Sequence, residues 1–122
     1  MSCPLRIGLL GLAFVALMPS WALARSPFDG SWSVVIITRS GNCDRATRAG
    51  VRIFDGYISS EGSGFDLRGQ VSRNGTLRAV ISAGSQSASG AGRLSRTRGH
   101  GVWRGRGNSG YCGGTWEAER RE

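Results

Sequence analysis

Arginine is the residue type in this sequence whose number and spacing most clearly suggest chemistry. The 122 residues include 16 basic side chains, all arginine, against eight acidic ones. A guanidinium group can bind phosphate, sulfate or carboxylate through two parallel hydrogen bonds. Short alternating strands would turn five arginines toward one exposed surface, here called the Arg face. Its members are Arg68, Arg78, Arg93, Arg104 and Arg106. Like charges side by side on a sheet are mildly destabilising, so this clustering predicts an anionic partner.

The arrangement of the Arg face depends on the turn between its last two strands. A two-residue turn at Arg98-Gly99 would set Arg93 opposite Arg104, with Arg78 and Arg106 together in a neighbouring row. Anionic polysaccharide or anionic lipid headgroups are the expected partners. We expect no specific nucleic-acid recognition, because the Arg face has no aromatic residue on which bases could stack. A compositional bias toward arginine, which also favours solubility, is the alternative explanation.

The sequence offers no assembled catalytic or metal-binding group. His100 is the single histidine, and we expect it in an exposed turn without an acidic neighbour to orient it as a general base. Glu117 and Glu119 would share the outer face of the last strand, where carboxylates usually pair with arginine. Gly105-x-Gly107 lacks the strand–loop–helix context of a phosphate-binding loop. We therefore expect no enzyme activity, cofactor or metal.

The first 24 residues are typical of a signal peptide. Arg6 supplies the positive charge, an apolar run follows from Ile7 to Met18, and Ala22-Leu23-Ala24 provides small residues for cleavage after Ala24. The run of about 12 residues is short for a membrane span, which needs about 20. We expect a single β domain over residues 25–122 that is exported to the periplasm or secreted, with no transmembrane span.

Cleavage at that point would remove Cys3 and leave Cys43 and Cys112. An even pair of cysteines in an oxidising compartment predicts one disulfide. Two free thiols sharing a metal with His100 would need a fourth ligand, which the spacing does not provide.

The elements that must position these residues are all expected to be strands. Turn-forming pairs separate short alternating runs, and no stretch combines helical apolar spacing with good helix formers. The pattern predicts an antiparallel up-and-down meander of about eight strands that closes into a barrel, with a strongly coiled open sheet as the alternative. The expected strands are 31–39, 48–54, 57–61, 65–73, 76–82, 86–96, 101–107 and 111–120.

Three turns fix most of the register. Two-residue loops at Asp55-Gly56 and Gly84-Ser85 keep apolar partners on one face. At Asn74-Gly75 a two-residue loop would mix the faces, so we predict a three-residue loop with Gly75 left-handed. In a closed barrel, Cys43 and Cys112 then meet at one rim, beside the seam between the first and last strands. Eight strands leave an interior just wide enough for side chains, so we expect no roomy cavity.

Asp29-Gly30-Ser31-Trp32 at the start of the first strand and Arg120-Arg121 at the end of the last resemble the Gly-x-Trp motif and closing arginine of lipocalin- and avidin-like (calycin) barrels. The resemblance implies that Trp32 caps the barrel end opposite the disulfide, under Arg120 or Arg121. Taken whole, the chain also resembles small exported bacterial β-proteins of uncharacterised function. These share the Phe-Asp-Gly-x-Trp start, the paired cysteines and a Cys-x-Gly-x-Trp ending.

We expect an exported, non-enzymatic binding or interaction module that uses the Arg face to hold anionic envelope or extracellular polymers. One alternative is a calycin-like carrier with a small ligand in its interior. The other is an envelope protein or inhibitor acting through the loop from Ser40 to Thr47, which Cys43 tethers.

Overall fold

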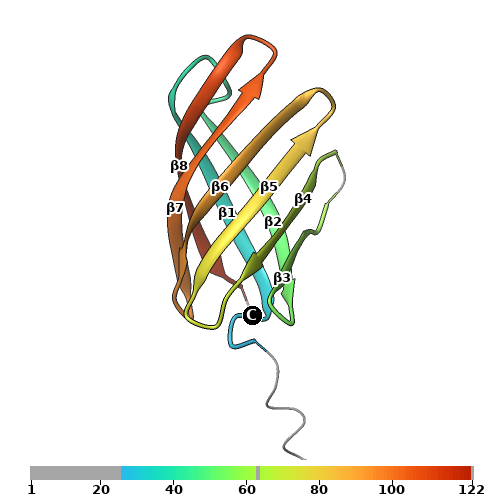
Figure 1. The fold of residues 1–122 in the computed structure, drawn as a ribbon, viewed down its shortest axis with the longest axis vertical. Coiled ribbons are helices and arrows are strands. Elements are labelled where there is room, and N and C mark those ends of the chain that lie inside the picture. Colours follow the sequence, from blue (N-terminus) through green and yellow to red (C-terminus); the bar gives the residue numbers. More distant parts are fainter. Residues whose placement is uncertain (1–25, 63, 122) are drawn as a thin grey trace, which may run out of the picture.

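The described part of the chain folds into a closed β-barrel. The computed structural model describes residues 26–62 and 64–121; the expected signal peptide and Cys3 lie outside them. Each strand pairs antiparallel with the next, and the last pairs with the first (Figure 1). This confirms the predicted fold class. The strands are β1 (Gly30–Ser40), β2 (Ala46–Phe54), β3 (Tyr57–Ser60), β4 (Asp66–Val71), β5 (Thr76–Ala83), β6 (Gln86–Leu94), β7 (Arg98–Gly107) and β8 (Gly110–Arg120).

The three turns that fixed the predicted register form as expected. Phe54 pairs with Tyr57 across Asp55-Gly56, both of which have positive φ. Between β4 and β5, the Ser72 N–H donates to the Thr76 carbonyl and encloses a three-residue loop, in which Gly75 is left-handed at φ 95°. Ala83 pairs with Gln86 across Gly84-Ser85. Ile53 therefore pairs with Ile58, Leu67 with Ile81 and Val71 with Leu77, all on the inner face.

The turn between β6 and β7 differs from the prediction. The two-residue loop is Arg96-Thr97 rather than Arg98-Gly99, so β7 begins earlier than expected and Leu94 lies opposite Gly99. The Ser95 hydroxyl accepts from the Arg98 N–H at 3.1 Å and donates to the Arg98 carbonyl at 3.0 Å, which closes the loop. The predicted turn would have set Leu94 opposite Trp103, two large side chains in one place. The observed register sets each against glycine.

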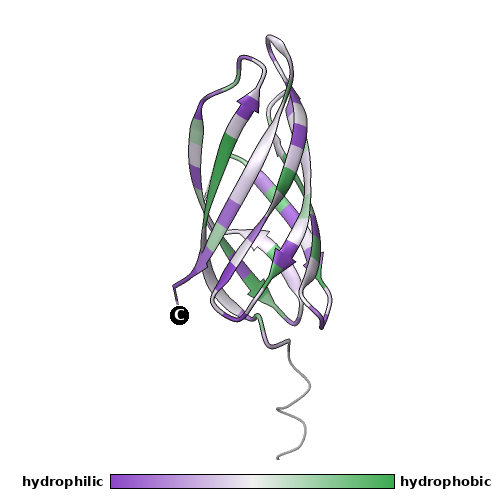
Figure 2. Cartoon of the chain, turned by 90° about the vertical axis from the view of Figure 1, so that its left-hand side faces the viewer, coloured by the Kyte–Doolittle hydropathy of each residue, from purple (hydrophilic) through white to green (hydrophobic). Residues whose placement is uncertain are grey.

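The core is formed by the inward-facing residues of the strands, which alternate with outward-facing ones. Figure 2 shows this alternation as hydrophobic and hydrophilic residues in turn, with pale stretches of intermediate hydropathy. Two inner tryptophans occupy rows in which the neighbouring strands carry glycine. Trp103 lies between Gly114 and Gly90, whereas Trp116 is flanked on one side by Gly101, with Gly92 on the next strand beyond it. Bare backbone on the flanking strands makes room for the indole rings.

The disulfide joins the two strands that close the barrel. Cys43, in the loop between β1 and β2, bonds to Cys112 on β8, with 6.1 Å between their Cα atoms. β1 and β8 pair along most of their length, from Trp32 opposite Arg120 to Ser40 opposite Gly113. The bond therefore lies beside the closure seam at one rim, as predicted.

The opposite end of the barrel is plugged. Phe28 and Trp32 are buried there, and the Trp32 indole N–H donates to the Phe28 carbonyl at 2.9 Å. Phe28 was not predicted as a core residue, because it precedes the first strand and has no alternation to place it. At the disulfide end, the described residues surround a hollow that we call the mouth.

Candidate functional site

The five arginines of the Arg face lie on the exposed side of the four consecutive strands β4 to β7. Their arrangement differs from the prediction because the β6–β7 turn falls two residues earlier. Arg93 lies opposite His100 and not Arg104, while Arg104 lies opposite Ser89. Ala91 lies between Arg78 and Val102, so Arg106 is not in that row.

Three of the five arginines surround one shallow groove across the outer faces of β4 to β7. Its floor consists of small or uncharged residues, and Val80 and Val102 on it are 59% and 61% exposed. Arg68 has an ion pair with Asp66 at 3.3 Å. Within residues 26–62 and 64–121, no carboxylate forms an ion pair with Arg78 or Arg104. The groove is lined by Arg68, Gln70, Arg78, Val80, Ser89, Ala91, Val102 and Arg104.

The other two members of the Arg face lie apart from the groove. Arg93 belongs to a row that continues through His100 to Glu117 on β8. Arg106 lies at the mouth of the barrel, where its guanidinium stacks over the Tyr111 ring at 4.9 Å. The structure thus divides the predicted surface into one groove with three arginines and two separate positions.

An exposed aromatic residue borders the groove, contrary to the expectation that the Arg face has none. Tyr57 on β3 pairs with Gln70, and Gln70 pairs with Arg78. Directly paired residues share a face of the sheet, so Tyr57 and Arg78 both point outward in one row. The Tyr57 side chain is 61% exposed, and Phe54, its partner across the hairpin, is 58% exposed.

The barrel interior holds a small apolar cavity of about 140 Å³. It is below the ~300–1,000 Å³ of typical ligand sites, in keeping with the expectation of no roomy cavity. A second hollow of about 370 Å³ occupies the mouth and includes Arg106 and Asn108. Both hollows are lined by Ile36, Ile81, Ala88 and Trp103.

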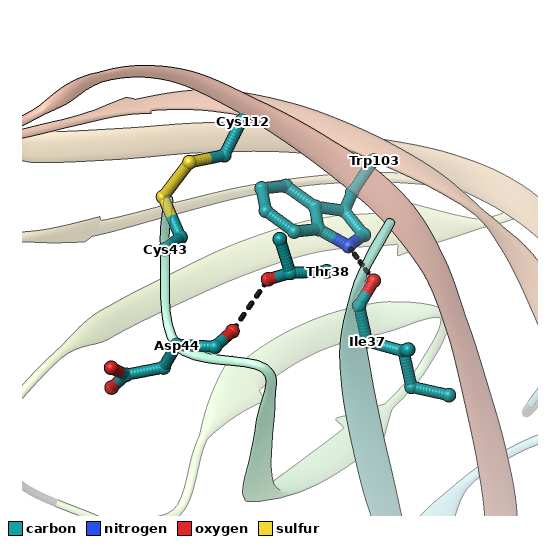
Figure 3. The surroundings of a disulfide bond; sticks show 6 residues. All are labelled: Ile37, Thr38, Cys43, Asp44, Trp103 and Cys112. Carbon is teal, nitrogen blue, oxygen red and sulfur yellow. Dashed lines mark hydrogen bonds between the residues drawn. A yellow bond between two sulfur atoms is a disulfide. The ribbon is translucent and has the colours of Figure 1, made fainter. Parts of the chain in front are cut away.

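The loop that carries Cys43 covers one side of the mouth (Figure 3). The Thr38 hydroxyl donates to the Asp44 carbonyl, and the Thr38 N–H donates to the Arg45 carbonyl at 2.9 Å. Beside this loop, the Trp103 indole N–H reaches across β8 and donates to the Ile37 carbonyl at 3.0 Å. Hydrogen bonds and the disulfide therefore hold the loop at both of its ends.

The groups considered for catalysis lie on the outer surface of β7 and β8, and His100 has an acidic cross-strand partner there, contrary to the expectation that it has none. His100 is in strand β7 rather than in a turn, opposite Glu117 on β8. Glu119 pairs with Arg98 at 3.7 Å. Among the described residues, no group of three or more histidine, cysteine, aspartate or glutamate side chains could hold a metal ion.

The residues named by the calycin resemblance meet at the plugged end. The Arg120 guanidinium lies over the Trp32 ring at 5.3 Å. It donates to the Arg96 carbonyl at 2.8 Å, the Pro27 carbonyl at 3.2 Å and the Asp29 carbonyl. Arg121 points elsewhere and pairs with Glu61 at 2.6 Å. Arg120 is therefore the arginine that packs on Trp32.

No family model, curated protein or solved structure matches the chain. The described residues also contain no helix long and apolar enough to cross a membrane.

Proposed function

We propose that the protein is an exported, non-enzymatic binding module that holds anionic polymers of the cell envelope or its surroundings in the groove. The observation that carries this proposal is the placement of Arg68, Arg78 and Arg104 around one uncharged floor. The last two have no ion pair with any described residue, so their guanidinium groups are available to a ligand. The signal-peptide pattern and the disulfide support an exported location.

Substitution of arginine by lysine tests the proposal while keeping the charge. Binding of the purified, oxidised protein to dextran sulfate would be measured over a series of salt concentrations. In an Arg78→Lys/Arg104→Lys variant we expect about tenfold weaker binding, because lysine cannot make the two parallel hydrogen bonds of arginine. Arg93→Lys is the matched control, since Arg93 lies outside the groove.

A result with equal affinity for all three proteins would reject the groove as the binding site. Attraction would then reflect only the net positive charge, which every one of these variants retains. Vesicles with anionic lipid headgroups, run beside dextran sulfate, would show whether a membrane surface is the preferred source of negative charge.

The apolar cavity favours a second candidate function, the carriage of a small apolar ligand. Its volume of about 140 Å³ is close to that of engineered apolar cavities that bind benzene-sized molecules, ~150 Å³. Such a ligand would contact Trp103, which lines both the cavity and the mouth. Organic extraction of the purified protein followed by mass spectrometry tests this candidate. Absence of an extractable ligand, together with unchanged tryptophan emission on addition of small hydrocarbons, would count against it.

A further inference from the structure

Two hollows on the outer surface of the barrel lie side by side and share two lining residues; together they are called the track. The groove contains Gln70 and Arg78, and these residues also line a second hollow that contains Tyr57. The track therefore begins at Tyr57 on β3 and ends at Arg104 on β7, crossing the strands rather than following them. Asp55 in the β2–β3 turn lies at its outer end.

The spacing along the track follows from the strand pairing. Tyr57, Gln70 and Arg78 are consecutive partners on three adjacent strands. Neighbouring strands are about 4.8 Å apart, which puts Tyr57 and Arg78 about 10 Å apart at Cα. Arg104 lies two further strands away and two residues along from Arg78, a separation of about 12 Å.

The track combines three kinds of recognition chemistry. An exposed tyrosine ring offers a flat apolar surface against which the apolar face of a pyranose ring can pack. Arg78 and Arg104 offer two-point binding to carboxylates. Gln70 and Ser89 can hydrogen-bond to hydroxyl groups, and the small side chain of Ala91 between the arginines leaves the floor open to a flat ligand.

The spacing of the arginines in the track favours a polysaccharide over a nucleic acid as the ligand. A nucleic acid carries a phosphate on every nucleotide. In the track, Arg68 is paired with Asp66, and the two arginines without an ion pair among the described residues, Arg78 and Arg104, have Cα atoms about 12 Å apart. The aromatic residue of the track, Tyr57, lies at one end. A stacking surface for successive bases would need aromatic residues along its length. A polymer with a carboxylate on alternate sugars matches both features.

We propose that the ligand of the groove is an acidic polysaccharide with carboxylates on alternate sugars, with one sugar ring stacked on Tyr57 and its carboxylates on Arg78 and Arg104. This inference rests on the proposed function of the groove and adds the class of ligand and the role of Tyr57.

Hyaluronan is a suitable probe because its uronic acid alternates with a neutral sugar. Its affinity would be measured by calorimetry for the wild type and for Tyr57→Ala, Tyr57→Phe and Arg78→Gln variants. Tyr111→Ala is the matched control, because Tyr111 is also exposed but lies outside the track. We expect at least about fivefold weaker binding for Tyr57→Ala, and binding close to wild type for Tyr57→Phe and Tyr111→Ala.

The variants separate failure of this inference from failure of the proposed function. Equal hyaluronan binding by Tyr57→Ala and wild type, with a loss in Arg78→Gln, would overturn the stacking role and leave the anion-binding groove standing. No loss in either variant would overturn both. Single-stranded DNA of equal total charge would be run as a competitor, and tighter binding of DNA than of hyaluronan would overturn the ligand class. Circular dichroism of each variant confirms that the barrel is folded.

Discussion

Arg120 is the side chain that ties the greatest number of separate segments together at the plugged end of the barrel. From the end of β8 it donates to the segment before β1 and to the β6–β7 turn, while its guanidinium covers Trp32. Its neighbour Arg121 makes an ion pair with Glu61, whose side chain also accepts from the buried Ser31 hydroxyl. Two adjacent arginines thus have different structural roles.

Replacement of Arg120 by glutamine should lower the free energy of unfolding by about 2–3 kcal/mol, because hydrogen bonds from a charged donor contribute ~1.5–3 kcal/mol each and do not add fully. Arg121→Gln is the matched control, with an expected loss of ~0–1 kcal/mol for a partly exposed ion pair. Urea unfolding followed by tryptophan fluorescence measures both. Equal losses in the two variants would contradict the role given to Arg120.

At the scale of the strands, the two inner tryptophans act as cross-links between strands that are not neighbours. Trp116 on β8 reaches over Gly101 on β7, and its indole N–H donates to the Ala91 carbonyl on β6 at 3.2 Å. Trp103 on β7 reaches over β8 in the opposite direction to bond with β1. Each tryptophan therefore joins three strands, and the glycine on the middle or neighbouring strand leaves room for its indole ring.

A methyl group at Gly101 should disturb this arrangement. The added Cβ would lie 2.5 Å from the Trp116 indole nitrogen and closer still to the Ala91 carbonyl oxygen that this nitrogen donates to. Overpacking of this kind typically costs ~1–3 kcal/mol. We expect Gly101→Ala to lose stability in that range and to alter the near-UV circular dichroism of the tryptophans. Gly62→Ala is the control, because among the described residues no atom beyond its chain neighbours lies within 4 Å of its added Cβ. Unchanged stability and near-UV spectrum in Gly101→Ala would show that the indole position does not depend on the glycine.

At the scale of the whole molecule, the disulfide stabilises the pairing of β1 with β8, which joins the two ends of the barrel sequence. Its cysteines are 69 residues apart. Cross-linking over such a loop is worth about 4 kcal/mol in a chain-entropy treatment of the unfolded state. For a small domain whose net stability is ~5–15 kcal/mol, this is a large fraction.

A Cys43→Ser/Cys112→Ser variant should therefore unfold at much lower urea concentration, with a loss of about 4 kcal/mol. The wild type in dithiothreitol should approach the same urea midpoint of unfolding. This control separates loss of the disulfide from any effect of the introduced serines. If the variant and the oxidised wild type shared one midpoint, the disulfide would not be a major source of stability.

The sequence predicted the closed barrel, the disulfide and three turns because each depends on local turn chemistry or on alternation. Two features of the candidate site could not be predicted from the sequence. The β6–β7 turn could be placed at Arg98-Gly99 or at Arg96-Thr97, and packing of Leu94 and Trp103 against glycine on the facing strand distinguishes them. The loop between β3 and β4 carries no turn pair of known geometry, so the sequence could not place Tyr57 in the row of Arg78.

The order of strand pairing also has a consequence for how the barrel forms. Seven of the eight pairings among the described residues join strands that follow one another along the chain, whereas the pairing of β1 with β8 joins its two ends. Contacts between distant segments form slowly because the chain between them must first be ordered. The hairpins should therefore assemble before the seam closes, and closure brings the two thiols together. The rate at which the thiols disappear during refolding in an oxidant then follows the last step of assembly.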